Sequence, residues 1–299
     1  MNPDALKGSI VAVVTPMSRD GGLDLSAFRN LLSLHRAAGT RGIVVAGTTG
    51  EGASLVESEF QALLSAAVEH LDGKLPVIAG VGSPDTAKSV KLAGLAAGSG
   101  VDALLCVTPY YLKTTQEGLR RHYGALADAV DLPMVLYNVP ARTGVDLLPE
   151  TVEALSRSAQ VIGIKEARPD LDRIQELVQR TGPGFHVLSG DDPTGLGALN
   201  NGAVGIISVT ANVAPRAMQD MVDMVAGGQV DQALRLNQRL DELHRLIGRE
   251  PNPIPVKAML AALGLVKPVI RLPLMPPSAA LADDIERSIT GGLRDLLIA

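Results

Sequence analysis

The sequence has 299 residues, of which 46% are hydrophobic and 20% charged, a composition typical of a globular protein with a large buried core. Its 32 acidic and 27 basic side chains leave a net charge of −5 at pH 7, which argues against a nucleic-acid partner, because phosphate binding needs a clustered basic surface. No apolar run is long enough to span a membrane, so we expect no membrane partner.

The N-terminus and the cysteine content both bear on the cellular compartment. The chain begins without the charged-then-apolar order of a secretory signal. It holds one cysteine, Cys106, which cannot form an internal disulfide and is most simply a core residue. We therefore expect a cytoplasmic protein.

Strand-like and helix-like segments alternate through most of the chain. Eight short apolar segments have the length of buried strands, namely residues 10–15, 43–46, 77–79, 103–107, 134–138, 161–165, 186–189 and 204–209. The stretches between them carry apolar residues at helical spacing and end in breakers such as Gly39. Eight such units predict an α/β fold of the (β/α)8 TIM barrel type, with an open doubly wound sheet as the alternative.

The strand pattern stops at about residue 229. Residues 229–249 and 278–297 are predicted helices. Between them, Pro251, Pro253 and Pro255 break the chain before a short helix at 256–263. We therefore divide the chain into a barrel at 1–228, which would carry the chemistry, and a C-terminal helical region at 229–299. We expect the helical region to pack on the barrel or on a neighbouring subunit, with no catalytic part.

Three polar clusters follow predicted strands, where the active-site face of a barrel lies. The first is GTTGEG at 47–52, with glycines and two hydroxyls, Thr48 and Thr49, that suit a small anion such as a carboxylate. It lacks the lysine of a phosphate-binding P-loop. A purely structural turn is an equally good interpretation of this cluster alone.

The second cluster is YNVPARTG at 137–144. Tyr137 at the end of a strand can pass a proton through its hydroxyl, and Arg142 can bind a carboxylate with two hydrogen bonds. Taken singly, the tyrosine could instead fill the core, and the arginine could be a solvated loop charge.

The third cluster is VIGIKEA at 161–167, an apolar strand in which Lys165 is the exceptional residue. A buried lysine is rare, and burial disfavours its ammonium form, which leaves a free amine to attack a carbonyl and form a Schiff base. The alternatives are a lysine that extends out of the barrel mouth or one paired with Glu166. Strand alternation favours placing Glu166 on the opposite face, so we interpret Lys165 as a nucleophile.

Other polar residues give weaker signals. The histidines are scattered without metal-ligand spacing, so we expect no catalytic metal. Asp191 and Asp192 are adjacent carboxylates of the kind that more often cap a helix than bind a metal. Tyr110 and Tyr111 share one loop, which suggests either a functional site or aromatic packing at a subunit contact.

Taken together, the motifs closely resemble the dihydrodipicolinate synthase family of Schiff-base-forming pyruvate lyases. The resemblance extends from Gly8 to Lys257 and is carried by GTTGE at 47–51, TPYY at 108–111, YNVPxRTG at 137–144, IGIKEA at 162–167, SGDD at 189–192 and GIISVTANV at 205–213. It implies condensation of pyruvate with L-aspartate 4-semialdehyde to 4-hydroxy-tetrahydrodipicolinate, in diaminopimelate and lysine biosynthesis. It also implies a (β/α)8 barrel with a C-terminal helical region.

The resemblance implies a role for each matching position. Lys165 would form the imine with pyruvate, Tyr137 would transfer protons, and Thr49 would link Tyr137 to Tyr111, which would reach in from a neighbouring subunit of a homotetramer built as a dimer of dimers. Thr48 and Thr49 would hold the carboxylate of pyruvate, and Arg142 would bind the carboxylate of the aldehyde. Gly190 and Ile207 would line the pyruvate pocket. The imine nitrogen is the electron sink, so no metal or organic cofactor is implied.

Two alternative functions are a sugar-acid aldolase and a pyruvate-binding barrel without turnover, and the sequence also bears on inhibition by lysine. A pyruvate-dependent aldolase of the same family acting on a sugar acid, of the N-acetylneuraminate or 2-keto-3-deoxygluconate type, is the nearest alternative, and the arginine at position 142 favours the synthase. A barrel that binds pyruvate-like ligands without turnover would need no buried amine. The positions that match the family's lysine site are Phe60, Pro84 and Lys88, and a cationic Lys88 would repel the ammonium of lysine, so we expect weak or absent inhibition by lysine.

Overall fold

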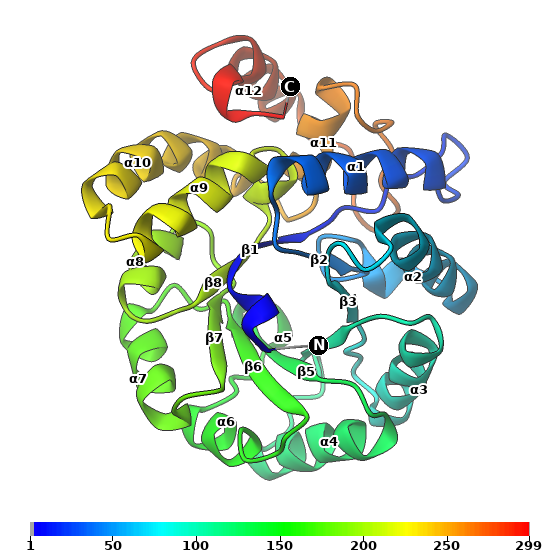
Figure 1. Cartoon of the computed structure of the whole chain (residues 1–299). Helices are drawn as coiled ribbons and strands as arrows, with labels where there is room; N and C mark the ends of the chain where they lie inside the picture. Colours follow the sequence, from blue (N-terminus) through cyan, green and yellow to red (C-terminus); the bar gives the residue numbers. More distant parts are fainter. Residues whose placement is uncertain (1–2, 299) are drawn as a thin grey trace.

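The computed structural model describes residues 3–298, and within them eight parallel strands close into a barrel (Figure 1). Each strand pairs with its neighbour in sequence, and β8 returns to β1. The strands are β1 (Gly8–Ala12), β2 (Gly42–Val45), β3 (Val77–Gly80), β4 (Ala103–Val107), β5 (Met134–Asn138), β6 (Val161–Glu166), β7 (His186–Ser189) and β8 (Gly205–Ser208). The predicted (β/α)8 barrel is confirmed, and the open sheet is wrong.

Helices follow the strands, and all but the short α5, which lies over the barrel opening in Figure 1, cover the barrel from outside. They are α1 (Leu25–Ala38), α2 (Glu57–Leu71), α3 (Thr86–Gly98), α4 (Gln116–Ala129), α5 (Pro140–Thr143), α6 (Pro149–Leu155), α7 (Leu171–Thr181), α8 (Gly195–Asn200) and α9 (Pro215–Ala226). Short 3-10 turns lie at η1 (Pro3–Leu6), η2 (Gly52–Ser54) and η3 (Thr210–Asn212). No helix of residues 3–298 has the length and apolarity needed to cross a membrane.

The C-terminal region is helical, as its sequence predicts. It consists of α10 (Val230–Ile247), α11 (Ile254–Ala262), α12 (Ala279–Thr290) and the turn η4 (Arg294–Leu296). These helices lie together at one edge of the barrel beyond α9 and α1 (Figure 1). The segment 278–297, expected as one helix, ends as a helix at Thr290, because the glycine pair at 291–292 interrupts it.

Buried side chains form two layers separated by the strands. One apolar cluster fills the barrel interior, and a larger one lies between the barrel and its helices and extends to the C-terminal region. Alternation along β5 illustrates the division, since Val135 and Tyr137 belong to the inner cluster whereas Met134 and Leu136 belong to the outer one. The same alternation decides which polar side chains at the strand ends face the barrel interior.

The outer layer contains a fully buried histidine on α1, His35, whose Nδ1 lies 3.2 Å from Thr40 Oγ1. Burial lowers its pKa from 6.5 to about 4. The unfolded chain therefore takes up a proton as the pH falls below about 6.5, whereas the native protein resists this until about pH 4. The stability that depends on a neutral His35 is present above pH 6.5 and is lost as the pH falls toward 4.

We expect the native chain to lose about 2 kcal/mol of its free energy of unfolding between pH 7 and pH 5 through protonation of His35 in the unfolded state. Urea unfolding of the native chain and of His35→Gln, at one subunit concentration, measures this difference. The variant should lose less stability than the native chain over this range, while His70→Gln, at a partly exposed position, should change the pH dependence less. Equal pH dependence in the native chain and His35→Gln would contradict the prediction.

Candidate active site

Lys165 and Tyr137 lie side by side at the carboxyl ends of adjacent strands. They are direct register partners in the pairing of β6 with β5. The Nζ atom of Lys165 lies 4.5 Å from the centroid of the Tyr137 ring, and the lysine is only 4% exposed. The amine thus faces an aromatic ring instead of extending to solvent, and the structure brings these two candidate residues together.

The neighbouring residues on the same strands, Asn138 and Glu166, face the opposite side. Asn138 Nδ2 donates to both carboxylate oxygens of Glu166, at 3.1 and 2.9 Å. Glu166 also accepts from the backbone N–H of Arg168 at 2.9 Å and is fully buried. The expectation that alternation separates Glu166 from Lys165 is therefore correct, and the alternative of a Lys165–Glu166 pair is not observed.

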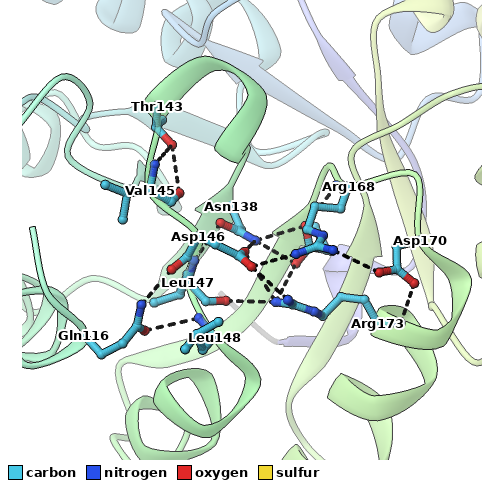
Figure 2. Close-up of polar contacts among 11 residues, drawn as sticks. Gln116, Asn138, Thr143, Val145, Asp146, Leu147, Leu148, Arg168, Asp170 and Arg173 are labelled. Carbon is cyan, nitrogen blue, oxygen red and sulfur yellow. Dashed lines mark hydrogen bonds and ion pairs between the residues drawn. The ribbon is translucent and has the colours of Figure 1, made fainter. Parts of the chain in front are cut away.

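Burial raises the pKa of Glu166 to about 7, against the opposing effect of its hydrogen bonds from Asn138 and Arg168. The carboxyl belongs to a larger polar network, drawn in Figure 2, that also contains Asp146, Arg168 and Arg173. Arg173 is 9% exposed and donates to Asp146 at 2.9 Å. Sequence reasoning did not assign this network, although Asn138 and Glu166 both lie in motifs that it singled out.

Gly190, after β7, packs directly on Lys165. A Cβ at this position would lie 2.7 Å from Lys165 Cε and 2.9 Å from its Cγ, so a side chain here would displace the lysine. The backbone N–H of Gly190 donates to the carbonyl of Glu166 at 2.7 Å. Ile207 on β8 is fully buried in the same inner cluster as Tyr137. Gly190 thus contacts Lys165 and Ile207 faces the barrel interior, and their role in a pyruvate pocket stays a prediction.

The GTTGE turn follows β2 with an unusual backbone. Glu51 adopts a left-handed conformation, with φ of 55°, and a Cβ on Gly52 would lie 2.0 Å from the carbonyl oxygen of Ala46, so only glycine fits there. Thr49 is 2% exposed, whereas Thr48 is exposed. The Thr49 hydroxyl accepts a hydrogen bond from Asn252 Nδ2 at 2.9 Å.

The C-terminal region contacts this turn at a second point. Lys257 on α11 forms an ion pair with Glu51, Nζ to Oε1 at 2.5 Å, and the two residues are 4% and 5% exposed. Together with Asn252, this pair joins the helical region to the turn that carries Thr49. The expectation that the region only packs is therefore too narrow. The one available signal was the run NPIPVK at 252–257, which sequence analysis used only as part of a resemblance.

Arg142 and Tyr111 lie outside the buried group. Arg142 is exposed on α5, and Tyr111 is 87% exposed in the loop after β4, with a left-handed φ of 74°. The backbone N–H of Tyr111 donates to the carbonyl of Thr143 at 3.2 Å, which ties its loop to α5. Within residues 3–298 of one chain, no hydrogen bond joins Thr49 to Tyr137 or Tyr111, so the proposed proton path stays a prediction.

The remaining acidic candidates have local hydrogen bonds. Asp191 accepts from the N–H and the hydroxyl of Thr194, at 3.1 and 2.7 Å, and Asp192 accepts from the N–H groups of Val209 and Thr210, at 2.9 and 2.8 Å. Neither carboxylate caps α8, because its N-cap residue Thr194 makes no side-chain capping hydrogen bond, so the helix-capping interpretation is not confirmed. Asp191 binds within its own turn, and Asp192 binds the start of η3. Among the residues that the structure describes, no group of three or more His, Cys, Asp or Glu side chains is arranged to hold a metal ion.

We expect Lys257→Met to lower the free energy of unfolding by about 3–5 kcal/mol, because it leaves the carboxylate of Glu51 buried without its cation. Lys267→Met is the matched control, since Lys267 pairs with Asp24 while 44% exposed and should contribute less than about 1 kcal/mol. Denaturant unfolding of both variants measures the two effects. Equal losses in the two variants would contradict a special role of the buried pair.

Three comparisons place the chain among known proteins. The model of the dihydrodipicolinate synthetase family matches residues 5–291. The 4-hydroxy-tetrahydrodipicolinate synthase of Saccharophagus degradans is 45% identical, over 95% of this chain and 98% of its own, and that of Ectopseudomonas mendocina is 49% identical, over 90% and 92%. The crystal structure of the chloride-inhibited dihydrodipicolinate synthase from Acinetobacter baumannii, complexed with pyruvate, superimposes with a TM-score of 0.93 at 41% identity, over 95% and 98% of the two chains. The chain therefore belongs to the dihydrodipicolinate synthetase family.

Proposed function

We propose that this chain is a lyase of the diaminopimelate and lysine pathway that condenses pyruvate with L-aspartate 4-semialdehyde to 4-hydroxy-tetrahydrodipicolinate through a Schiff base. The observation that carries the proposal is the buried amine of Lys165, 4.5 Å from the Tyr137 ring and free of a carboxylate partner. A relative of the same fold binds pyruvate, the substrate that such an amine would attack. Relatives with the synthase name cover nearly the whole chain.

In this proposal the chemistry begins at Lys165. Its amine attacks the ketone carbon of pyruvate, and loss of water gives an imine. Loss of a methyl proton gives the enamine, whose carbon attacks the aldehyde carbon of the second substrate and forms the carbon–carbon bond. The amino group of that substrate then attacks the imine carbon, closes the ring and releases Lys165. Tyr137, beside the amine, is the proposed proton donor and acceptor.

The proposed binding roles belong to the turn after β2, the short helix after β5 and two residues of the barrel interior. Thr48 and Thr49 are proposed to hold the pyruvate carboxylate, since the turn offers N–H and hydroxyl groups at the mouth of β2. Exposed Arg142, on the short helix after β5, is proposed to bind the carboxylate of the aldehyde. Gly190 and Ile207 complete the pocket around Lys165.

Tyr111 is proposed to act in a neighbouring subunit, as part of a homotetramer arranged as a dimer of dimers. Its ring is 87% exposed, and the adjacent Leu112 is 62% exposed, so this loop presents apolar surface of the kind that subunit contacts cover. A dimer would then be the minimal active unit. The catalytic barrel is assigned to residues 1–228 and the helical region to 229–299.

Weak or absent inhibition by lysine stays part of the proposal. Phe60 on α2 is 3% exposed and belongs to the outer apolar layer, so this position offers a ligand no polar group. Lys88 on α3 is exposed and cationic, which disfavours an ammonium ligand beside it.

The first test of the proposed function is borohydride reduction in the presence of pyruvate, followed by intact mass measurement. We expect a pyruvate-sized adduct on the native chain and none on Lys165→Ala, because Lys165 is buried beside Tyr137, whereas Lys257, the other buried lysine of residues 3–298, is paired with Glu51. Lys88→Ala, which removes an exposed lysine, should keep the adduct. A folded native chain that gives no adduct would remove the Schiff-base mechanism.

Gly190→Ala tests the packing around the lysine. Its new Cβ would lie 2.7 Å from Lys165 Cε, so the lysine must shift from its present position. We expect kcat to fall by about a hundredfold, as expected for a reacting group displaced by about 1 Å. Gly94→Ala, at an open position on α3, should keep native activity. Equal kcat in Gly190→Ala and the native chain would show that the close packing has no part in catalysis.

A further inference from the structure

The outward face of the strand ends beside Lys165 holds a group of charges that the proposed mechanism does not use. Glu166 and Arg173 are buried, and Asp146, Arg168 and Asp170 are partly exposed. Asp146 and Arg173 flank the buried carboxylate of Glu166, and Arg168 bridges Asp146 and Asp170 at 2.7 and 3.1 Å (Figure 2). Arg173 Nη1 lies 4.0 Å from Glu166 Oε2. Burying the charges of Glu166 and Arg173 costs free energy, so their arrangement calls for a reason other than stability alone.

The hydrogen bonds of Asn138 fix its orientation completely. Its Nδ2 donates to Asp146 at 2.8 Å as well as to Glu166, and its Oδ1 accepts from the backbone N–H of Leu147 at 2.9 Å. A flipped amide would place its oxygen against two carboxylates, so only one orientation satisfies the site. Asn138 is thereby held at three points, and its position on β5 is held with it.

The pairing register converts this fixed contact into a constraint on the lysine. Asn138 pairs with Glu166, and Tyr137 pairs with Lys165, one position earlier on both strands. Because successive side chains point to opposite faces, a contact between the outward pair sets the spacing and stagger of the inward pair. Glu166 directly follows Lys165 in sequence, so its contact with Asn138 would affect the position of the lysine through the backbone of β6.

The same contacts close the loop that carries Arg142. Asn138 stands before α5, and Asp146 and Leu147 stand after it, so the hydrogen bonds among them join the two ends of residues 139–145. Arg173 reinforces the far end by donating to the carbonyl of Leu147 at 3.2 Å.

We propose that Glu166 is a positioning residue for the Schiff-base lysine: its buried carboxylate, bound by Asn138 on the neighbouring strand, holds the strand ends that carry Lys165 and Tyr137 and the base of the loop that carries Arg142. This inference rests on the proposed function. It assigns to Glu166 and Asn138 no contact with substrate. Their effect is on the geometry of the amine.

Glu166→Gln tests the proposal with a side chain of the same shape. The carboxylate accepts at both oxygens, so the amide NH2 of the variant would have to face the NH2 of Asn138 and either Arg173 or the N–H of Arg168, with donors opposed to donors. We expect the strand ends to shift while the fold persists. Glu176→Gln on α7 is the matched control, since Glu176 is 43% exposed and pairs only with Arg180.

The readout is the time course of the borohydride-trapped pyruvate adduct, which separates two quantities. The end point gives the fraction of competent sites, and the rate gives how well the amine is placed. We expect Glu166→Gln to reach the native end point at a rate about tenfold or more below native, as misplacement of a reacting group predicts. Glu176→Gln should keep both quantities within about twofold, because an exposed pair contributes little.

A merely structural role would lower the end point or the melting temperature and leave the rate of the competent sites within about twofold of native. That result would overturn the proposal. Asn138→Ser removes the other half of the contact and decides the matter if Glu166→Gln does not fold, with the same slowed rate expected. In the double variant the two effects should not multiply, because both changes break one contact. An absent adduct on the native chain would instead defeat the proposed function itself.

Discussion

Parallel pairing of β5 with β6 is the constraint on which the rest of the site depends. At the carboxyl ends of these strands, one register pair faces the interior and the next faces outward. The interior pair is Tyr137 and Lys165, where an amine can remain free of a carboxylate, and the outward pair is Asn138 and Glu166, where charges are gathered and compensated. The proposed nucleophile and the carboxylate that follows it directly in sequence thus lie on opposite faces of one strand.

A second constraint comes from the far end of the chain. The turn after β2 places Glu51 in a left-handed conformation and buries its carboxylate, which then needs a cation that the barrel itself does not supply at that point. Lys257 supplies it from α11, and Asn252 holds the hydroxyl of Thr49 nearby. A boundary drawn at residue 229 therefore separates two parts of the architecture, but the proposed carboxylate-binding turn is completed only when both are present.

Much of this was predictable from sequence because local patterns decide it. Strand length, breakers and eight repeated units predicted the barrel, and a lysine in an apolar strand indicated a buried amine at the strand end. Alternation correctly placed Glu166 away from Lys165. What local patterns could not predict were contacts across long separations in sequence, such as Lys257 with Glu51 or Asn252 with Thr49, since these depend on how the barrel closes and where α11 docks. The helix expected at 278–297 was also too long, because amphipathic spacing continued past the glycines that end it.

The two buried lysines of residues 3–298 show why burial alone does not identify a nucleophile. Lys165 and Lys257 are equally buried, at 4% exposure each, and each lies in a run that the resemblance includes, IGIKEA at 162–167 and NPIPVK at 252–257. Burial lowers the pKa of Lys257 against the opposing effect of Glu51, but the carboxylate at 2.5 Å occupies the amine. Lys165 has the ring of Tyr137 beside it and forms no ion pair with Glu166, so its amine is the one proposed to react with a carbonyl compound. The neighbour of each lysine therefore distinguishes the proposed nucleophile from the structural lysine. Strand alternation sets that neighbour for Lys165, and docking of α11 sets it for Lys257.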